Sequence, residues 1–206
     1  ECDDGFGFVL KGRANEFGYQ SMTSPMTLSA FDLALANHGT MSFDTVMAPA
    51  VRYCFDGFAV RPRVHAFWMQ PAQCGRMERV AVVNKLPAAR KIYLDAYGNL
   101  LKVGDILKNP DMGRTYERIA TEGSDVFYTG AIADLIEADM LANGGLITKQ
   151  DLAACAPTVK PPLFGSYRGI QVATNQLPGG GPMILQMLNI LESFDLSSMG
   201  HNSALY

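Results

Sequence analysis

The sequence predicts a helix-rich α+β fold, and two patterns along its 206 residues support this prediction. Apolar residues recur three and four positions apart in the N-terminal and central parts, which is the spacing of amphipathic helices. Residues 158–164 and 167–174 instead have the character of two extended strands, and an apolar helical segment follows them after a run of glycines. Strands followed by a helix in this way predict a sheet with a helix packed against it.

The first predicted helix covers residues 27–38, after about twenty residues that we interpret as irregular or short extended structure. One face of this helix carries three apolar residues: Leu28, Phe31 and Leu35. Thr27 or Ser29 can cap its start, and Gly39 ends it. The segment therefore carries both a start signal and a stop signal for a helix.

Residues 42–107 contain two segments with a recognisable structural pattern and one segment without. A second helix is predicted over residues 42–57, where Pro49 is either tolerated near the start or produces a kink. Residues 60–90 have no clean period, so no regular element is predicted there. Residues 91–107 are typical of a hairpin with its turn at Gly98-Asn99.

Two stronger helical patterns follow the predicted hairpin. One face of the first carries Met112, Tyr116, Ile119 and Ala120. The second predicts one continuous helix capped by Ser124 and ended near Gly144, with an apolar face formed by Tyr128, Ile132, Leu135, Ile136 and Met140. Thr148 followed by Asp151 resembles a capping box and predicts the start of a short helix.

The glycines in "NQLPGGGPMILQ" raise the question of a phosphate-binding loop. A Walker loop needs a Lys-Ser/Thr pair after its last glycine, but Gly181 is followed by Pro182 and Met183. The dinucleotide fingerprint needs a third glycine where Ile184 stands. The glycines therefore predict a tight turn from strand to helix that passes close to the sheet. The following helix is apolar on most sides, so we expect it to be buried against that sheet.

Composition excludes several classes of partner. A net charge of −3, a pI near 5.6 and the absence of a basic run give no footprint for nucleic acid or an anionic membrane surface. No apolar stretch reaches the ~18 residues of a membrane span. The cysteines form no CxxC and the histidines no HxxxH, so neither a metal nor a cofactor is predicted; these residues are Cys2, Cys54, Cys74, Cys155, His38, His65 and His201.

The residues alone show no catalytic site. GxSxG is absent, and no serine has a lysine three residues later. A Cys–His pair stays open but has no recognisable spacing. Asp134, Glu137 and Asp139 lie opposite an apolar face at helical spacing, which favours a solvated surface over acid–base chemistry.

Longer segments resemble a known family. "RIATEGSDVFYTGAIADLIEADMLANGGLITKQDLAA", "PPLFGSYRGIQVATNQLPGGGPMILQMLNILESFDL" and "HGTMSFDTVMAPAVRYCFDGFAV" are similar to the γ-glutamyltransferase family of N-terminal-nucleophile hydrolases. The resemblance covers residues 21–206 and is weak over 61–90. It implies an αββα sandwich, of which residues 1–206 are an incomplete, helix-rich portion of the large subunit of one domain.

The resemblance also implies an activity. Family members cut their precursor into a large and a small subunit, and the threonine exposed at the start of the small subunit attacks an amide. We therefore expect a small-subunit partner, an amide or γ-glutamyl substrate, no cofactor and a periplasmic or secreted location. The nucleophile is expected after Tyr206, so no catalytic residue is assigned within this chain.

Few residues can be given roles on this basis. The family's carboxylate-binding arginine is expected upstream of Glu1, so Arg13, Arg52 and Arg168 are not assigned to that role. Cys2 would become an N-terminal thiol if Glu1 were lost, but the resemblance does not support this. The remaining candidates, for the wall of a substrate pocket, are Gly179, Gly180 and Gly181.

One departure from the family leaves alternatives open. The family's loop reads Pro-Pro-Ser-Ser-Gly-Gly, whereas residues 177–182 read Leu-Pro-Gly-Gly-Gly-Pro. Ordinary glutathione chemistry is therefore weighed against a specialised amidohydrolase or β-lactam-type acylase of the same fold. A third hypothesis is a non-catalytic homologue that serves as an interaction subunit.

Overall fold

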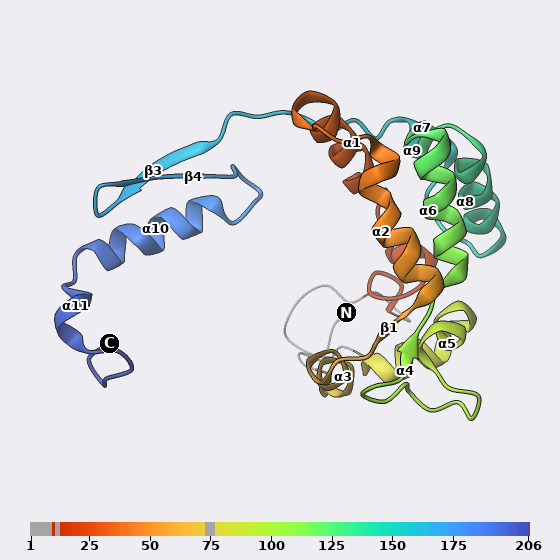
Figure 1. Ribbon diagram of the computed structural model, residues 1–206, viewed down its shortest axis with the longest axis horizontal. Helices are drawn as coiled ribbons and strands as arrows, with labels where there is room; N and C mark the ends of the chain where they lie inside the picture. The colour runs from red at the N-terminus through yellow and green to blue at the C-terminus, as the bar shows by residue number, and fades with distance from the viewer. Residues whose placement is uncertain (1–9, 11–12, 73–76) are drawn as a thin grey trace. The chain divides into compact units, whose positions relative to one another are not determined.

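The computed structural model describes residue 10 and residues 13–72 and 77–206 (Figure 1). The chain divides into two compact units, the first ending at Pro157 and the second covering Thr158–Tyr206, and each is described by itself. Most of the predicted irregular N-terminal segment, with Cys2, lies outside the described residues, as does Cys74. The described part of that segment includes the short 3-10 helix η2 (Tyr19–Ser21).

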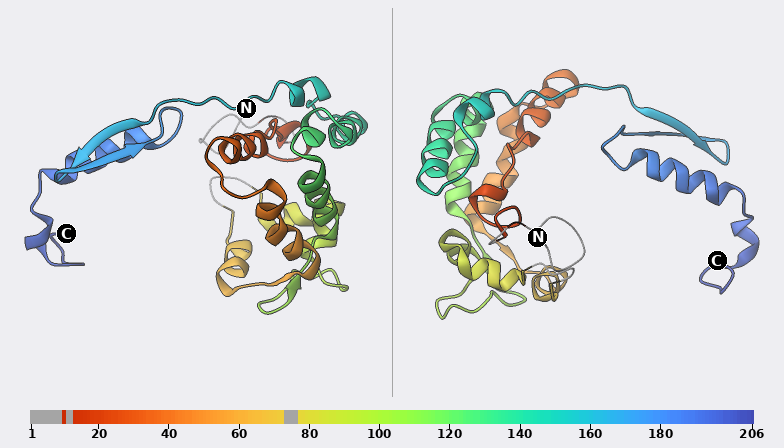
Figure 2. Two further views of the ribbon diagram at one scale, coloured as in Figure 1. Left: turned by 45° about the horizontal axis from the view of Figure 1, so that its top comes forward. Right: turned by 180° about the vertical axis from the view of Figure 1, so that it is seen from behind.

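The first unit is built almost entirely of helices. In chain order its elements are α1 (Thr27–His38), α2 (Phe43–Asp56), β1 (Phe58–Ala59), α3 (Pro62–Met69), α4 (Arg79–Lys85), α5 (Pro87–Tyr93), β2 (Ile106–Leu107), α6 (Pro110–Glu122), α7 (Asp125–Tyr128), α8 (Ala131–Ala142) and α9 (Lys149–Ala153). The orange α2 and the green α6 lie side by side in Figures 1 and 2. The unit is thus organised around a helix pair.

The first two helices begin and end as predicted, but the predicted cap of α1 is wrong. Neither Thr27 nor Ser29 caps it: the helix starts after Met26, and the Ser29 hydroxyl donates a hydrogen bond to the Met26 carbonyl oxygen at 2.9 Å. Phe31 is 64% exposed in this unit, so the predicted apolar face is only partly covered. α2 continues through Pro49 without interruption.

The segment with no clean period forms three short helices, and the predicted hairpin at 91–107 is correct only around its turn. α3 and α5 each start with a proline in the first turn, where the missing N–H costs no hydrogen bond. Leu94 bridges Leu100 antiparallel, and backbone hydrogen bonds flank this bridge, from Asp95 N–H to the Asn99 carbonyl oxygen at 2.7 Å and from Leu101 N–H to the Tyr93 carbonyl oxygen at 2.9 Å. The pairing does not extend into two strands, and β2 pairs with β1 instead. The Asp95 carboxylate accepts the backbone N–H groups of Tyr97 and Asn99 at 2.9 and 2.8 Å, so a side chain closes the turn.

Close contact between α2 and α6 depends on Gly113. A Cβ on this residue would lie 3.0 Å from ring atoms of Phe55 and 3.1 Å from the Cβ of Cys54. The Asn109 backbone N–H, just before α6, also donates to the Cys54 carbonyl oxygen at 3.0 Å. Burial in this contact raises the pKa of the Cys54 thiol. The glycine lets the two helix backbones approach without a side chain between them.

The continuous helix predicted from Ser124 is broken in two. The backbone N–H groups of Thr129 and Gly130 both donate to the Asp125 carbonyl oxygen, at 2.9 and 3.0 Å, and α7 ends there. α8 then starts at Ala131, and Leu135 on its surface is 66% exposed. The helical spacing of apolar residues continues across this break in the sequence, because the apolar side chains of α7 and α8 pack into the same core.

Tyr128 joins the core of the unit to α1. Its ring is 6% exposed and packs with Ala133, Met140, Ile147 and Leu152. Its hydroxyl donates to the Pro25 carbonyl oxygen at 2.8 Å and accepts the Ser29 backbone N–H at 2.9 Å. One buried side chain thus satisfies two polar backbone groups at the start of α1.

Replacing this tyrosine by phenylalanine tests the connection. Tyr128→Phe keeps the ring but leaves two backbone groups without their partner, so we expect the free energy of unfolding to fall by about 1–3 kcal/mol. Urea denaturation of the protein that carries this chain measures the change. Tyr97→Phe is the matched control, since Tyr97 is 91% exposed and its loss of a hydroxyl should leave stability unchanged. Equal effects of both substitutions would contradict this role.

The predicted capping box at α9 is confirmed. Thr148 Oγ1 accepts the Asp151 backbone N–H at 3.2 Å, and the Asp151 carboxylate accepts the Thr148 backbone N–H at 2.8 Å. Hydrogen bonds from the Thr148 hydroxyl and then from its N–H hold the pKa of Asp151 below its ordinary value. The two residues therefore satisfy each other's polar groups at the helix start.

The capping box makes a pH-dependent contribution to stability. Because the folded pKa of Asp151 is lowered, its contribution is present above the unfolded pKa near ~4 and is lost as pH falls through the folded pKa. Thr148→Ala should cost about 1 kcal/mol near neutral pH and raise the pKa of Asp151 toward its ordinary value. NMR titration of the carboxylate and denaturation at neutral and acidic pH check both results. An unchanged pKa of Asp151 would contradict the mutual bonding.

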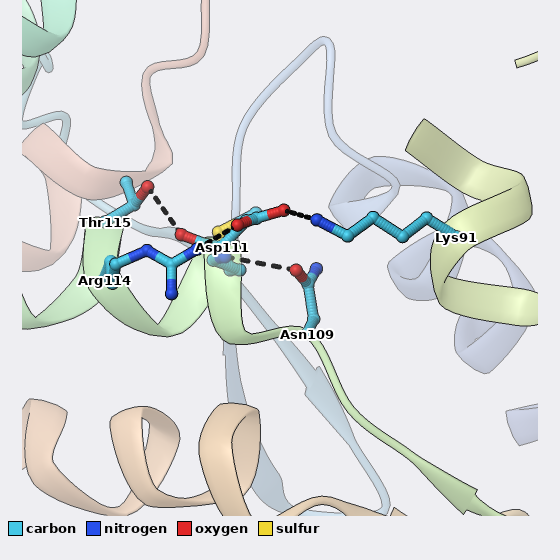
Figure 3. A network of polar contacts seen from close by, with 6 residues as sticks. Lys91, Asn109, Asp111, Arg114 and Thr115 are labelled. Carbon is cyan, nitrogen blue, oxygen red and sulfur yellow. Dashed lines mark hydrogen bonds and ion pairs between the residues drawn. The ribbon is translucent and has the colours of Figure 1, made fainter. Parts of the chain in front are cut away.

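A polar network joins α5 to the start of α6 (Figure 3). Lys91 Nζ lies 2.7 Å from Asp111 Oδ2, and Arg114 also pairs with this carboxylate. The Lys91 ammonium, followed by Arg114, lowers the pKa of Asp111. Asn109 caps α6 through its side-chain oxygen, which accepts the Met112 N–H at 3.1 Å. These ion pairs connect the two helices at the surface. Because they are exposed, they contribute little to the free energy of folding.

The second unit is a hairpin with a helix on it. β3 (Leu163–Tyr167) and β4 (Ile170–Thr174) pair antiparallel, with Leu163 opposite Thr174 and Tyr167 opposite Ile170. The predicted first strand, 158–164, is thus placed too early. Both turn residues, Arg168 and Gly169, have positive φ, which matches the right-handed twist of the strands. The hairpin leads through the glycine loop into α10 (Gly181–Glu192), then α11 (Leu196–Met199).

The prediction that α10 is buried against a sheet is only half correct. It packs on β3, where Leu185 is 9% exposed and lies against Gly165. Leu188 is half-buried, but five other large apolar side chains of α10 are exposed in this unit: Met183, Ile184, Met187, Ile190 and Leu191. A two-stranded hairpin is too narrow to cover a helix that is apolar on most sides. Among the described residues, no helix is both long and apolar enough to span a bilayer.

Candidate functional site

The candidate site is a hollow of about 600 Å³ in the second unit. It is lined by Thr158, Lys160, Pro161, Pro162, Ala173, Thr174, Asn175, Gln176, Leu177, Pro178 and Gly179. These residues come from the extended segment before β3 and from the end of β4 with the loop that follows it. The volume is within the range of small-molecule sites.

The two walls of the hollow are connected by hydrogen bonds of the loop. Gln176 Nε2 donates to the Pro161 carbonyl oxygen at 2.8 Å and so joins the loop to the opposite segment. The Gly179 backbone N–H donates to the Gln176 carbonyl oxygen at 2.9 Å and closes a tight turn. The peptide bond between Leu177 and Pro178, in this turn, is cis. These two hydrogen bonds constrain the loop and connect it to the segment before β3.

None of the three glycines has a positive φ, and close approach to backbone explains Gly181, whereas Gly179 meets mainly a side chain that can move. A Cβ on Gly181 would overlap the Asn175 carbonyl oxygen, and one on Gly179 would overlap the Asn175 side-chain amide. Gly180 has φ −75°, and a Cβ there would meet nothing within 4 Å. The glycines form the predicted turn from strand to helix, with Pro182 in the first turn of α10. Of the three, only Gly179 is among the residues that line the hollow.

The hollow has a cationic character. Lys160 is the only ionisable residue among the described residues that line it. The hydroxyls of Thr158 and Thr174 and the amides of Asn175 and Gln176 supply polar groups, whereas Pro161, Pro162, Leu177 and Pro178 supply apolar walls. Sequence analysis did not single out Lys160 or Gln176, because nothing in a Lys-Pro-Pro segment indicates which loop it will face.

The three carboxylates weighed for acid–base chemistry, Asp134, Glu137 and Asp139, lie in the first unit and bind neighbouring side chains or backbone. Lys149 binds Asp134 through its ammonium at 2.5 Å and Glu137 through its backbone N–H at 2.8 Å, and Asn143 donates to Asp139. These carboxylates fix the loop after α8. Within the described part of the chain, no group of three His, Cys, Asp or Glu residues could hold a metal ion.

The three arginines are also engaged locally. Arg13 pairs with Glu16 at 2.8 Å, and the Arg52 guanidinium lies 5.8 Å from the centre of the Tyr53 ring. Arg168 Nη2 donates to the Phe194 carbonyl oxygen at 2.8 Å, while its backbone N–H donates to Glu192 at 2.6 Å. Arg168 therefore holds the hairpin turn to the end of α10.

The fold places the chain among the N-terminal-nucleophile hydrolases of the γ-glutamyltranspeptidase type. The crystal structure of Helicobacter pylori γ-glutamyltranspeptidase matches with a TM-score of 0.82 and 28% identity, over 99% of this chain and 57% of that one. The predicted fold class, the αββα sandwich of which this chain is a helix-rich portion, is thereby confirmed.

The family follows from the sequence comparisons. The family model described as gamma-glutamyltranspeptidase matches residues 7–206, and the chain belongs to this family. It is 37% identical over 202 residues to the glutathione hydrolase proenzyme of Escherichia coli (strain K12), covering 95% of this chain. It is 32% identical over 194 residues to the acylase ACY 1 proenzyme of Pseudomonas sp. (strain SE83), covering 94%. The chain spans 33% of the length of each of these relatives.

The contact at Gly181 can be tested against its neighbour. In the protein that carries this chain, Gly181→Ala should lower the free energy of unfolding by roughly 1–3 kcal/mol, because backbone must move to admit the methyl group. Gly180→Ala should be neutral or slightly stabilising, since its site is open and its φ is ordinary. Thermal unfolding of the two variants measures the difference. Equal stability of the two variants would contradict a close approach at Gly181.

Proposed function

We propose that this chain is part of the large subunit of a γ-glutamyltransferase-like amidase. The observation that carries this proposal is the family match over residues 7–206, supported by relatives that are described as glutathione hydrolase proenzymes. The term proenzyme supports a precursor that is processed into subunits. Residues 1–206 would then belong to one domain that a small subunit completes.

The proposed chemistry is acyl transfer through a covalent intermediate. The hydroxyl of a threonine at the start of the small subunit attacks the carbonyl carbon of the donor amide, while the α-amino group of the same residue accepts the hydroxyl proton. An α-amine with a pKa near ~8 is suited to this task. The carbon–nitrogen bond then breaks, the amine leaves with a proton, and water or an acceptor amine releases the acyl group from its ester.

This chain supplies scaffold and pocket wall in the proposal, and none of its residues is given a catalytic role. The hairpin β3–β4 and α10 hold the glycine loop in place through the Gly165 and Arg168 contacts described above. We propose that this loop, with Gly179, Gly180 and Gly181, forms part of the wall of the substrate pocket. The exposed apolar face of α10 supports burial against further parts of the sandwich.

A β-lactam-type or other specialised acylase is the second candidate. Similarity to the acylase ACY 1 proenzyme, at 32% identity over 94% of this chain, favours it. The Leu-Pro-Gly-Gly-Gly-Pro sequence of the loop, which lacks the two hydroxyls of the family's usual Ser-Ser pair, also supports a different acyl pocket. Both candidates use the same nucleophile and differ only in the acyl group.

N-terminal sequencing with intact mass tests the proposal. The protein that carries this chain should contain a second polypeptide that begins with threonine, and Thr→Ala at that position should abolish both cleavage and amide turnover. Parallel assays with a γ-glutamyl anilide and a β-lactam side-chain amide separate the two candidates. An uncut protein, or a second polypeptide that begins with a residue other than Thr, Ser or Cys, would contradict the amidase and favour the interaction-subunit hypothesis.

A further inference from the structure

The hollow beside the glycine loop has the composition of a site for a small anion. Its walls are fixed to each other by the Gln176–Pro161 hydrogen bond and by the turn that Gly179 closes. A site built in this way does not need the ligand to order the loop, which lowers the entropy cost of binding.

The charge of the hollow is positive and not neutralised from within. Lys160 has no hydrogen-bond or ion-pair partner among the described residues, and none of the described residues that line the hollow is acidic. The hydroxyl of Thr158 can donate a further hydrogen bond to an anion, whereas that of Thr174 already donates to Asn175 Oδ1 at 3.4 Å. A cationic ligand would be repelled here, whereas an anion gains a partner.

The number and type of donors favour a carboxylate over a phosphate. One ammonium supplies one positive charge, and the Gly179 N–H is not free to join a phosphate cradle because it donates to the Gln176 carbonyl oxygen. Pro161, Pro162 and Leu177 offer apolar surface for a short hydrocarbon or peptide portion next to the charge. A small, singly charged organic acid therefore fits the hollow best.

We infer that this hollow binds the carboxylate of a free amino acid or of the C-terminus of a short peptide, with Lys160 as the charged partner. Under the proposed function, on which only this part rests, such a ligand is the acceptor that takes the acyl group through its amino end. The hollow would then select acceptors that carry a free carboxylate.

Binding is tested first without turnover. In the processed protein that carries this chain, lysine ammonium groups are labelled by reductive ¹³C-methylation, and Lys160→Gln identifies the signal of Lys160. Glycine, glycylglycine and glycylglycinamide are then added in separate titrations. The Lys160 signal should shift with carboxylate ligands and stay in place with glycylglycinamide. Comparison of glycine with glycylglycine shows whether the ligand is a free amino acid or a peptide end.

Kinetics then test the acceptor role with a matched control. Lys160→Gln should raise KM for glycylglycine about two- to fivefold, the effect of one exposed ion pair, and leave KM for glycylglycinamide unchanged. Lys108→Gln removes the same charge from an exposed position in the first unit and should change neither value. Hydrolysis of the donor without acceptor should also be unchanged in both variants.

The outcomes separate this inference from the proposed function. The carboxylate site is contradicted if the Lys160 signal does not shift with glycine or glycylglycine, or if it shifts equally with glycylglycinamide. A specific shift in a protein that turns over no amide donor leaves the carboxylate site standing and refutes the proposed function. A specific shift with unchanged KM for glycylglycine overturns the acceptor role.

Discussion

Each unit of this chain has a close contact at a glycine, where an added Cβ would lie tightly against a neighbour or overlap it. In the first unit, Gly113 lies where α6 meets Phe55 and Cys54 of α2, and α7 continues the packing from α6 to α8 and α9. In the second unit, Gly181 lies against the Asn175 carbonyl oxygen and so sets where α10 begins relative to β4. Side-chain packing and hydrogen bonds then stabilise the arrangement of the elements. Tyr128 does so at the start of α1, and Arg168 does so between the hairpin turn and the end of α10.

The glycine run illustrates how one feature can have a steric cause and a functional consequence. Because Gly179 and Gly181 allow the chain to reverse beside β4, the loop between them and Asn175 turns toward the segment before β3. The Gln176–Pro161 hydrogen bond then fixes the hollow that contains Lys160. No nucleotide motif is needed to explain the glycines, and the polar character of the hollow comes from their neighbours. By contrast, the exposed Asp111 network joins only α5 to the start of α6 and lies in the first unit.

Local signals could be read from the sequence, whereas non-local partners could not. The bounds of α1, the stop at Gly57 and the Thr148–Asp151 capping box all follow from residues a few positions apart. The predicted hairpin at 91–107 forms only around its turn, because α5 extends to Tyr93 and β2 pairs with β1, nearly fifty residues earlier. Lys160 was missed for the same reason: its position opposite Gln176 is set by the fold. The αββα sandwich was predicted only from the family resemblance, because no local pattern in this chain indicates it.

The central proposal is that the protein carrying this chain forms an ester between an acyl group and a threonine at the start of a small subunit. Mass spectrometry of the rapidly quenched protein after mixing with a γ-glutamyl donor tests this most directly. The account predicts that the small polypeptide gains the mass of one γ-glutamyl group, on its N-terminal threonine, while the polypeptide containing residues 1–206 keeps its mass. Acyl mass on the latter polypeptide, or on neither while amide is still consumed, would contradict the account.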